Sequence, residues 1–227
     1  MSEIVYKNSD LIIGYKPSGT PTQKDPSGDK DFLSEIADQL ESVGERSELY
    51  LVHRLDRVVG GLLVLARNKR CAAYLSELAA SGELGKEYLA VVEGIAPGGE
   101  MTDYLYKSAP LGKSFVTDGK RQGAKLASLE YECVETVNTS KGPRSLVRIT
   151  LHSGRFHQIR AQFSSRALPL VGDNKYGSRD RASRSPALFA YKISIEMNEK
   201  INAQRLPDTS EYPWSLFADE SYKKCLT

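Results

Sequence analysis

One carboxylate between two arginines stands out in the stretch from Leu49 to Ala66, which reads LYLVHRLDRVVGGLLVLA. The carboxylate is Asp56, and the arginines are Arg54 and Arg57. An aspartate can act as a nucleophile or accept a proton when rigid elements hold it in place. The apolar residues before this charged group and the glycine pair after it predict two strands joined by a tight loop, with Asp56 at a strand end. The alternative is a surface ion pair with one of the two arginines, which would contribute little to stability.

A second candidate is Arg160, in a stretch that reads HSGRFHQIRAQFSSRALPLVGDNKYGS over residues 152–178. The pattern predicts a short helix after Gly154, and Arg160 flanks its apolar stripe. An arginine held against a buried face needs a carboxylate, because an unpaired buried charge costs several kcal/mol. A purely structural ion pair would also meet this need. The stripe consists of Phe156, Ile159 and Phe163.

The N-terminus of this predicted helix is a natural seat for a phosphate group. Three polar side chains accompany it, those of Arg155, His157 and Gln158. His152 and His157 are five residues apart with no third ligand nearby, so we predict no metal site here.

Positive charge is concentrated in one fifth of the chain. Residues 141–184 contain ten Lys or Arg against two acids, Asp173 and Asp180, although the whole chain has a net charge of only +2. This distribution favours a polyanion as a partner, with a generally solvated basic face as the alternative. Within this segment a serine-rich loop contains Arg179, Arg181 and Arg184, which we interpret as a flexible basic arm or, alternatively, as a disordered surface loop.

The remaining elements follow from hydrophobic periodicity and turn residues. In the second helix Tyr74, Leu75 and Leu78 are expected to face inward, after an N-cap at Asn68. Residues 101–123 have no assignable pattern, and the aromatic tail 212–217 is expected to cover the core rather than to form an exposed stacking surface. Strands are predicted over residues 3–6, 11–15, 86–94, 126–137, 145–152 and 188–197, and helices over 31–43 and 68–81.

Composition limits the class of protein. A chain of 227 residues that is 40% hydrophobic can bury a core as one large domain or two small ones. Three cysteines without C-x-x-C spacing predict neither a disulfide framework nor a zinc site. The longest apolar run, residues 58–66, is too short to span a bilayer, and no signal pattern begins the chain. A cytoplasmic location is therefore expected.

The stretch HRLDRVVGGLLVLARN resembles the second motif of the RluA-type pseudouridine synthases, commonly written HRLDRxTSGLLLxAK. The match is unbroken over residues 53–56 and 61–66. Val59 and Gly60 stand where the family usually has Thr and Ser, whose hydroxyls could support the catalytic loop by hydrogen bonds.

Three other stretches resemble this family in the correct order. Residues 16–21, KPSGTP, resemble its KPxG motif, although a plain turn has the same composition. Residues 86–94 resemble K-x-Y-x-A-x-V-x-G, in which the tyrosine, here Tyr88, lies in the active site. Residues 154–177 resemble GRxHQIRxHxxxxGxPxxGDxxYG, with Gln162 in place of the usual histidine and Ala167 in place of the usual glycine.

The resemblance implies an α+β fold, in which a mixed, mainly antiparallel sheet with flanking helices carries a central RNA-binding cleft. It implies one catalytic domain over residues 1–227, with the family-like core at about 11–197. The expected reaction isomerises uridine in structured ribosomal or transfer RNA, without metal or other cofactor. Asp56 would react at the sugar of a flipped-out uridine as nucleophile or base, Arg160 would pair with Asp56, and Tyr88 would stack on the base.

Further residues are expected to contact RNA, and the protein is expected to be a monomer that binds no membrane. The alternative is a non-catalytic RNA-binding protein on the same scaffold. A hydrolase acting on another glycosidic bond lacks the second carboxylate that such chemistry needs. The expected RNA-binding residues are His53, Arg54, Arg57, Arg155, His157, Gln158, Lys175, Arg179, Arg181 and Arg184.

Overall fold

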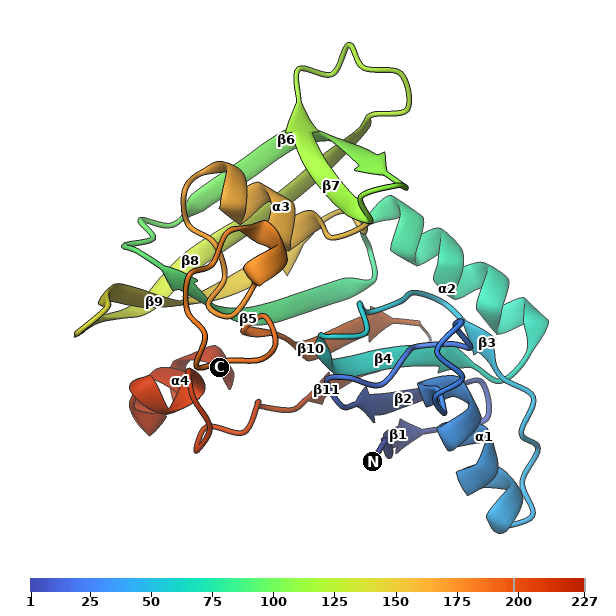
Figure 1. Ribbon diagram of the computed structural model, residues 1–227. Coiled ribbons are helices and arrows are strands. Elements are labelled where there is room, and N and C mark those ends of the chain that lie inside the picture. Colours follow the sequence, from blue (N-terminus) through green and yellow to red (C-terminus); the bar gives the residue numbers. More distant parts are fainter. Residues whose placement is uncertain (198, 227) are drawn as a thin grey trace. The chain divides into compact units, whose positions relative to one another are not determined.

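The computed structural model describes residues 1–197 and 199–226, and the chain forms two compact units (Figure 1). Unit 1 contains Met1–Lys86 and Ala190–Arg205, and unit 2 contains Glu87–Phe189 and Leu206–Thr227. The expectation of one catalytic domain over the whole chain stays a prediction. The α+β class is confirmed, since both units combine a sheet with helices.

The sheet of unit 1 is built around β4 (Gly60–Ala66), all seven residues of which are buried. An apolar run without alternation is what a strand covered on both faces requires. Antiparallel to β4 lies β2 (Leu11–Lys16), with β1 (Glu3–Lys7) on its other edge, and β3 (Tyr50–Leu51) also pairs with β4. A hairpin of β10 (Leu188–Glu196) and β11 (Lys200–Gln204) completes the strands of the unit. The predicted strands at 3–6, 11–15 and 188–197 are confirmed.

Two helices bury apolar faces in unit 1. Helix α1 (Phe32–Ser42) is capped by Asp31, whose side chain accepts a hydrogen bond from the Ser34 amide. The ring of Phe32 lies so close to β2 that a Cβ at Gly14 would be 2.8 Å from it, so only glycine allows this approach.

Helix α2 (Lys69–Ser81) begins after the predicted N-cap Asn68 and ends at Gly82, which has φ 85°. The helix packs on the unit 1 core through Cys71, Leu75 and Leu78. Tyr74 is 40% exposed, so the expectation that it faces inward was wrong. At 100° per residue, position 74 lies at the edge of the face that 71, 75 and 78 share.

The sheet of unit 2 is antiparallel, in the order β5 (Gly85–Glu93), β9 (Gly142–Leu151), β8 (Lys125–Thr139), β6 (Gly99–Ser108), β7 (Lys113–Thr117). The predicted strands at 126–137 and 145–152 correspond to β8 and β9, which pair antiparallel and are joined by a tight turn, because Thr139 and Gly142 are already partners. The stretch without an assignable pattern forms most of β6 together with β7.

Helix α3 (Gln158–Ser165) packs against β6 and β7 (Figure 1). It begins three residues later than the sequence indicates, because His157 adopts a left-handed conformation with φ 53°. Phe163 of the predicted stripe is fully buried and meets the Tyr131 ring edge-on at 4.9 Å.

Short helices complete unit 2: η1 (Asn174–Tyr176), η2 (Trp214–Leu216) and α4 (Asp219–Leu226). Trp214 and Phe217 are buried, as expected of a tail that covers a core. Among the described residues, none of the helices has the length and hydropathy needed to span a bilayer.

Candidate active site

Asp56 lies in the loop between β3 and β4, partly buried, at the first position of a β-turn. Its carbonyl accepts a hydrogen bond from the Val59 amide at 2.9 Å. The surface ion pair with a neighbouring arginine does not occur. Arg57 pairs instead with Asp25 at 3.5 Å and with Asp29, while Arg54 is exposed and forms no ion pair among the described residues.

A second loop, residues 16–22, holds the Asp56 loop in place. The ammonium of Lys16, which is fully buried, donates to the carbonyls of Pro17, Thr20 and Arg57 at 2.8 to 3.2 Å. Three acceptors match the three N–H groups of a charged lysine. Burial lowers the pKa of Lys16 to about 7, and the negative charge of Asp56 opposes this shift.

Backbone carbonyls on both sides of Asp56 are tied to the same second loop. Thr22 Oγ1 donates to the Leu55 carbonyl and Ser18 Oγ to the Val58 carbonyl, both at 2.8 Å. The Gly19 amide reaches the carbonyl of Arg57 at 2.8 Å. The hydroxyls that support the loop therefore come from positions 18 and 22, and those missing at 59 and 60 are not needed for this purpose.

His53, expected to contact RNA, has a structural contact. Its Nε2 accepts a hydrogen bond from the Val64 amide at 3.2 Å. Burial, with Lys86 as a smaller influence, lowers the pKa of His53 to about 3, so the ring is neutral.

Gly61 fixes the start of β4. It has φ 131°, and a Cβ there would lie 2.4 to 2.7 Å from backbone atoms of Ala190. A side chain is excluded at this position by both the backbone angle and the space.

Arg160 is buried on α3, and the carboxylate that the structure gives it is Asp173. The pair is bidentate, with Nε to Oδ2 at 2.7 Å and Nη2 to Oδ1 at 2.9 Å. The side chains are 5% and 1% exposed. The requirement for a carboxylate is thus met within unit 2, by an acid for which the sequence predicted no role. The pairing of Arg160 with Asp56 stays a prediction.

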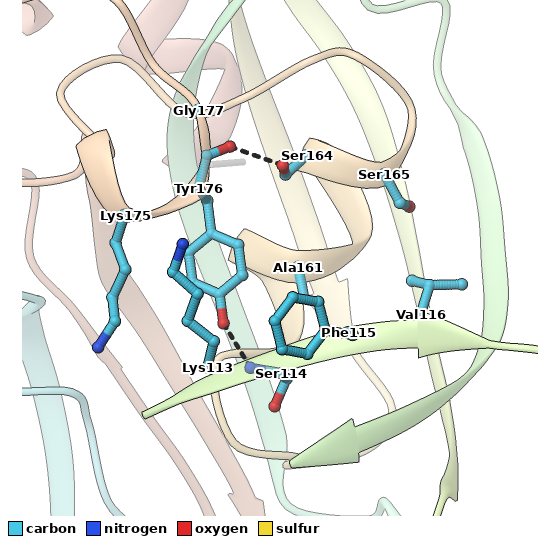
Figure 2. Close-up of a pocket in the computed structure, with 10 residues that line it drawn as sticks. All are labelled: Lys113, Ser114, Phe115, Val116, Ala161, Ser164, Ser165, Lys175, Tyr176 and Gly177. Atoms are coloured by element: carbon cyan, nitrogen blue, oxygen red, sulfur yellow. Dashed lines mark hydrogen bonds between the residues drawn. The ribbon is translucent and has the colours of Figure 1, made fainter. Parts of the chain in front are cut away.

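The ring of Tyr176 organises the surroundings of Arg160. The guanidinium lies 5.0 Å from the ring centroid, and the phenol oxygen accepts a hydrogen bond from the Ser114 amide at 2.7 Å (Figure 2). The same oxygen is 3.0 Å from His157 Nδ1. In the tautomer that leaves His157 Nδ1 unprotonated, this nitrogen accepts the tyrosine proton.

The neutral form of His157 agrees with its surroundings. Burial lowers its pKa to about 3, and the positive charges of Arg160 and Lys175 add to the effect. Its ring stacks on Phe156 with centroids 3.8 Å apart. The sequence predicted His157 as an RNA contact, but it did not reveal this hydrogen-bonded chain from β7 through η1 to α3.

Gln158 and Arg155 brace the turn before α3. Gln158 is buried, and its amide accepts from the Arg155 amide and donates to the Ser128 carbonyl, each at 3.1 Å. These contacts give Gln158 a structural role, and its expected contact with RNA stays a prediction. Arg155 is exposed and donates through Nε to the Leu126 carbonyl.

The ten cations of the basic segment, residues 141–184, fall into two groups of five. Five of its ten cations form ion pairs within unit 2, with Asp180, Glu132, Asp173 or Asp103. The other five are exposed and form no ion pair among the described residues. These five are Arg155, Lys175, Arg179, Arg181 and Arg184.

The arm that contains the last three of these arginines is anchored at Asp180, and its expected flexibility and contact with RNA stay predictions. Asp180 is fully buried and binds Lys141, Arg144 and the Tyr212 hydroxyl. Burial alone would raise its pKa, but hydrogen bonds from Tyr212 and Lys141 hold the pKa at about 2. The same contact and burial raise the pKa of Tyr212 to about 12.

Tyr88 lies on β5 opposite Ile149 and is 6% exposed. It belongs to unit 2 with Arg160, whereas Asp56 belongs to unit 1. Their assembly into one site stays a prediction. The described residues contain no group of three His, Cys, Asp or Glu side chains placed to hold a metal ion.

Comparison with known proteins gives consistent matches. Residues 10–165 match the family described as RNA pseudouridylate synthase. An uncharacterized RNA pseudouridine synthase of Zymomonas mobilis is 32% identical over 216 residues, with 92% of each chain covered. Ribosomal large subunit pseudouridine synthase C of Rickettsia felis is 29% identical over 214 residues, which are 93% of this chain and 68% of that protein.

Solved structures share the fold. Human RNA pseudouridylate synthase domain containing 1 superposes with a TM-score of 0.78 at 19% identity, covering 100% of this chain and 94% of the human one. Human RNA pseudouridylate synthase domain containing 4 superposes with a TM-score of 0.74 at 20% identity, covering 91% of this chain and 89% of the human one. The predicted fold, a mixed and mainly antiparallel sheet with helices, is thereby confirmed. Sequence motifs, family match and fold agree, and the chain belongs to the RluA-type family of RNA pseudouridine synthases, which isomerise uridine to pseudouridine in RNA.

Proposed function

We propose that this protein modifies ribosomal or transfer RNA and that Asp56 is the reacting carboxylate. The observation that carries the proposal is the state of the Asp56 loop. The loop is held through its carbonyls, by Lys16, Ser18 and Thr22. A backbone fixed in this way aims the carboxylate of Asp56, as a reacting group requires. The name of the Rickettsia felis relative makes large-subunit ribosomal RNA the first substrate to test.

The isomerisation breaks the bond between sugar C1′ and base N1, turns the base, and joins C1′ to C5. The proton on C5 is lost and N1 gains one, so no oxidant or co-reactant is required. A uridine within structured RNA must leave its stack to react. We assign Asp56 to the sugar, as nucleophile or base, and Tyr88 to stacking on the base.

We assign Arg160 to the orientation and ionisation of Asp56. A nearby positive charge favours the charged form of a carboxyl group. Asp173 binds Nε and Nη2 of the guanidinium and so fixes its plane. Nη1 is the nitrogen through which we propose that Arg160 acts on Asp56. On this assignment Asp173 is a positioning residue.

The test is pseudouridine mapping by carbodiimide tagging of ribosomal and transfer RNA. RNA from cells that lack the gene is incubated with the native protein, Asp56→Ala or Asp56→Asn. The matched control is Asp29→Asn, which removes an exposed carboxylate that pairs with Arg57. Native protein and control should form pseudouridine at the same discrete sites, and both Asp56 variants should form none while still binding RNA. Full turnover by either Asp56 variant would overturn the assignment.

A further inference from the structure

Unit 2 contains a cavity of about 340 Å³ between β7, α3 and η1 (Figure 2). Figure 2 shows the ring of Tyr176 within its wall, between the chains of Lys113 and Lys175 on one side and Phe115 on the other. Ser164 and Ser165 of α3 also line it, and no acidic side chain lines it among the described residues.

Two lysines, Lys113 and Lys175, line this cavity, and Lys107 lies opposite the lining residue Ser114 on the neighbouring strand β6. Lys113 Nζ lies 5.7 Å from the centroid of the Tyr176 ring, and Lys107 Nζ lies 4.6 Å from that of Phe156, the residue before His157. Lys175 Nζ is 3.2 Å from the place that a Cβ at Gly112, the residue before β7, would take.

None of the three lysines forms an ion pair in the described part of the chain. Like charges that gather without a counter-charge repel one another. Such a group is favourable when an anion binds between its members.

An aromatic ring stands next to these charges. Phe115 is 41% exposed, although it is a large apolar residue, and it lines the cavity with the neighbouring Val116, which is 36% exposed. Cations beside an exposed aromatic ring are the combination that binds single-stranded nucleic acid, through the phosphate and the face of the base. The volume falls in the range of about 300–1,000 Å³ that small-ligand sites occupy, enough for one nucleotide.

We propose that this cavity binds one nucleotide of the RNA substrate, a different one from the uridine that is isomerised. Its phosphate lies between Lys113 and Lys175, and its base lies against Phe115. The reacting uridine is excluded because the cavity wall offers no carboxylate for chemistry at the sugar. The proposal rests on the proposed function, since it requires RNA as the substrate.

The test measures the Kd for a large-subunit ribosomal RNA transcript by filter binding at two salt concentrations. The variant is Lys113→Ala with Lys175→Ala, and the matched control is Lys223→Ala with Lys224→Ala, which removes the same charge from the last turn of α4. Raising the salt from about 50 to 200 mM increases the Kd of both proteins. Because the variant has lost two phosphate contacts, its fold-increase in Kd should be about 7- to 12-fold smaller than that of the native protein. The control should keep the native salt dependence.

A third variant, Phe115→Ala, separates stacking from charge. It should weaken RNA binding by about 5-fold or more, with the native salt dependence, because stacking involves no counterion release. Free uridine monophosphate serves as a further arm. It should not displace the RNA at equal concentration, since one nucleotide lacks the other contacts of the chain.

Pseudouridine formation by the native protein is measured in parallel. If the native protein modifies the RNA and the lysine variant has the same salt dependence as its control, the cavity proposal fails and the function stands. If the native protein forms no pseudouridine, the proposed function fails, and the salt dependence still decides whether the cavity binds RNA. If free uridine monophosphate displaces the RNA, the proposal that the cavity binds a nucleotide within an RNA chain is wrong.

Discussion

The buried ion pair of Arg160 can be tested by removing its partner with Asp173→Ala. Both charges are almost fully shielded from water, at 5% and 1% exposure, and both hydrogen bonds are short. The variant removes from a buried guanidinium the charge of Asp173 and both of its acceptor oxygens. Breaking a buried pair in this way costs about 3–5 kcal/mol. We therefore expect Asp173→Ala to lower the free energy of unfolding by that amount.

Urea unfolding followed by the fluorescence of Trp214 measures the effect, because Trp214 is the only tryptophan and lies buried in the same unit. The control is Glu132→Ala, which breaks the pair with Arg148. That pair has a distance of 2.9 Å but exposures of 56% for the acid and 27% for the arginine. An exposed pair contributes about 0–1 kcal/mol, so the control should stay close to the native protein.

A third protein separates lost charge pairing from lost packing. Replacing Arg160 by Met together with Asp173 by Leu removes both charges and keeps apolar volume. Such a replacement is often neutral, so it should recover most of the stability that Asp173→Ala loses. It should still form no pseudouridine if Arg160 acts on Asp56. Equal unfolding free energies for Asp173→Ala and Glu132→Ala would refute the reasoning about the buried charge.

Two further predictions concern histidines and the Asp56 loop. The pKa values of His53 and His157 lie at about 3 in the folded protein, below the value of about 6.5 expected in the unfolded chain, so the unfolded chain binds more protons between these values. The free energy of unfolding should therefore be at its full value above about pH 6.5 and lower by about 1–2 kcal/mol per histidine at about pH 5. Urea unfolding measures the effect. The control is His152→Gln, at an exposed position, which should leave this pH dependence unchanged. Val59→Thr restores the usual family residue, but it should not raise the yield of pseudouridine, because Ser18 and Thr22 already donate hydrogen bonds to the loop. Because position 59 is buried, the added hydroxyl should lower the free energy of unfolding by about 1–3 kcal/mol.

Elements governed by local physics were predictable from the sequence. The apolar run of β4 and the N-cap at Asn68 each depend on residues within a few positions of one another. The hairpin of β6 and β7 was not, because its residues do not alternate cleanly between buried and exposed. Its position depends instead on long-range contacts, such as the hydrogen bond from the Ser114 amide to Tyr176, 62 residues away.

The sequence predicts candidate site residues, but it does not predict the contacts that hold them in place. The motifs point to Asp56 and Arg160, yet they do not reveal that Asp173 forms an ion pair with the arginine. Asp173 is thirteen residues beyond Arg160, on the other side of a helix end and a turn, so neither helical nor strand periodicity connects the two. Only the fold determines that distance.

Counting charges predicts the sign of a surface but not which charges face a ligand. Half of the cations in the basic segment form ion pairs inside unit 2, including Lys141 and Arg144, which pair with the buried Asp180 of the arginine arm. By contrast, Lys113 comes from a stretch whose charge pattern gave no signal, and the fold brings it to the same cavity as Lys175. The surface that we propose faces RNA is therefore defined by cations that form no ion pair among the described residues, and that property emerges only when distant segments are folded together.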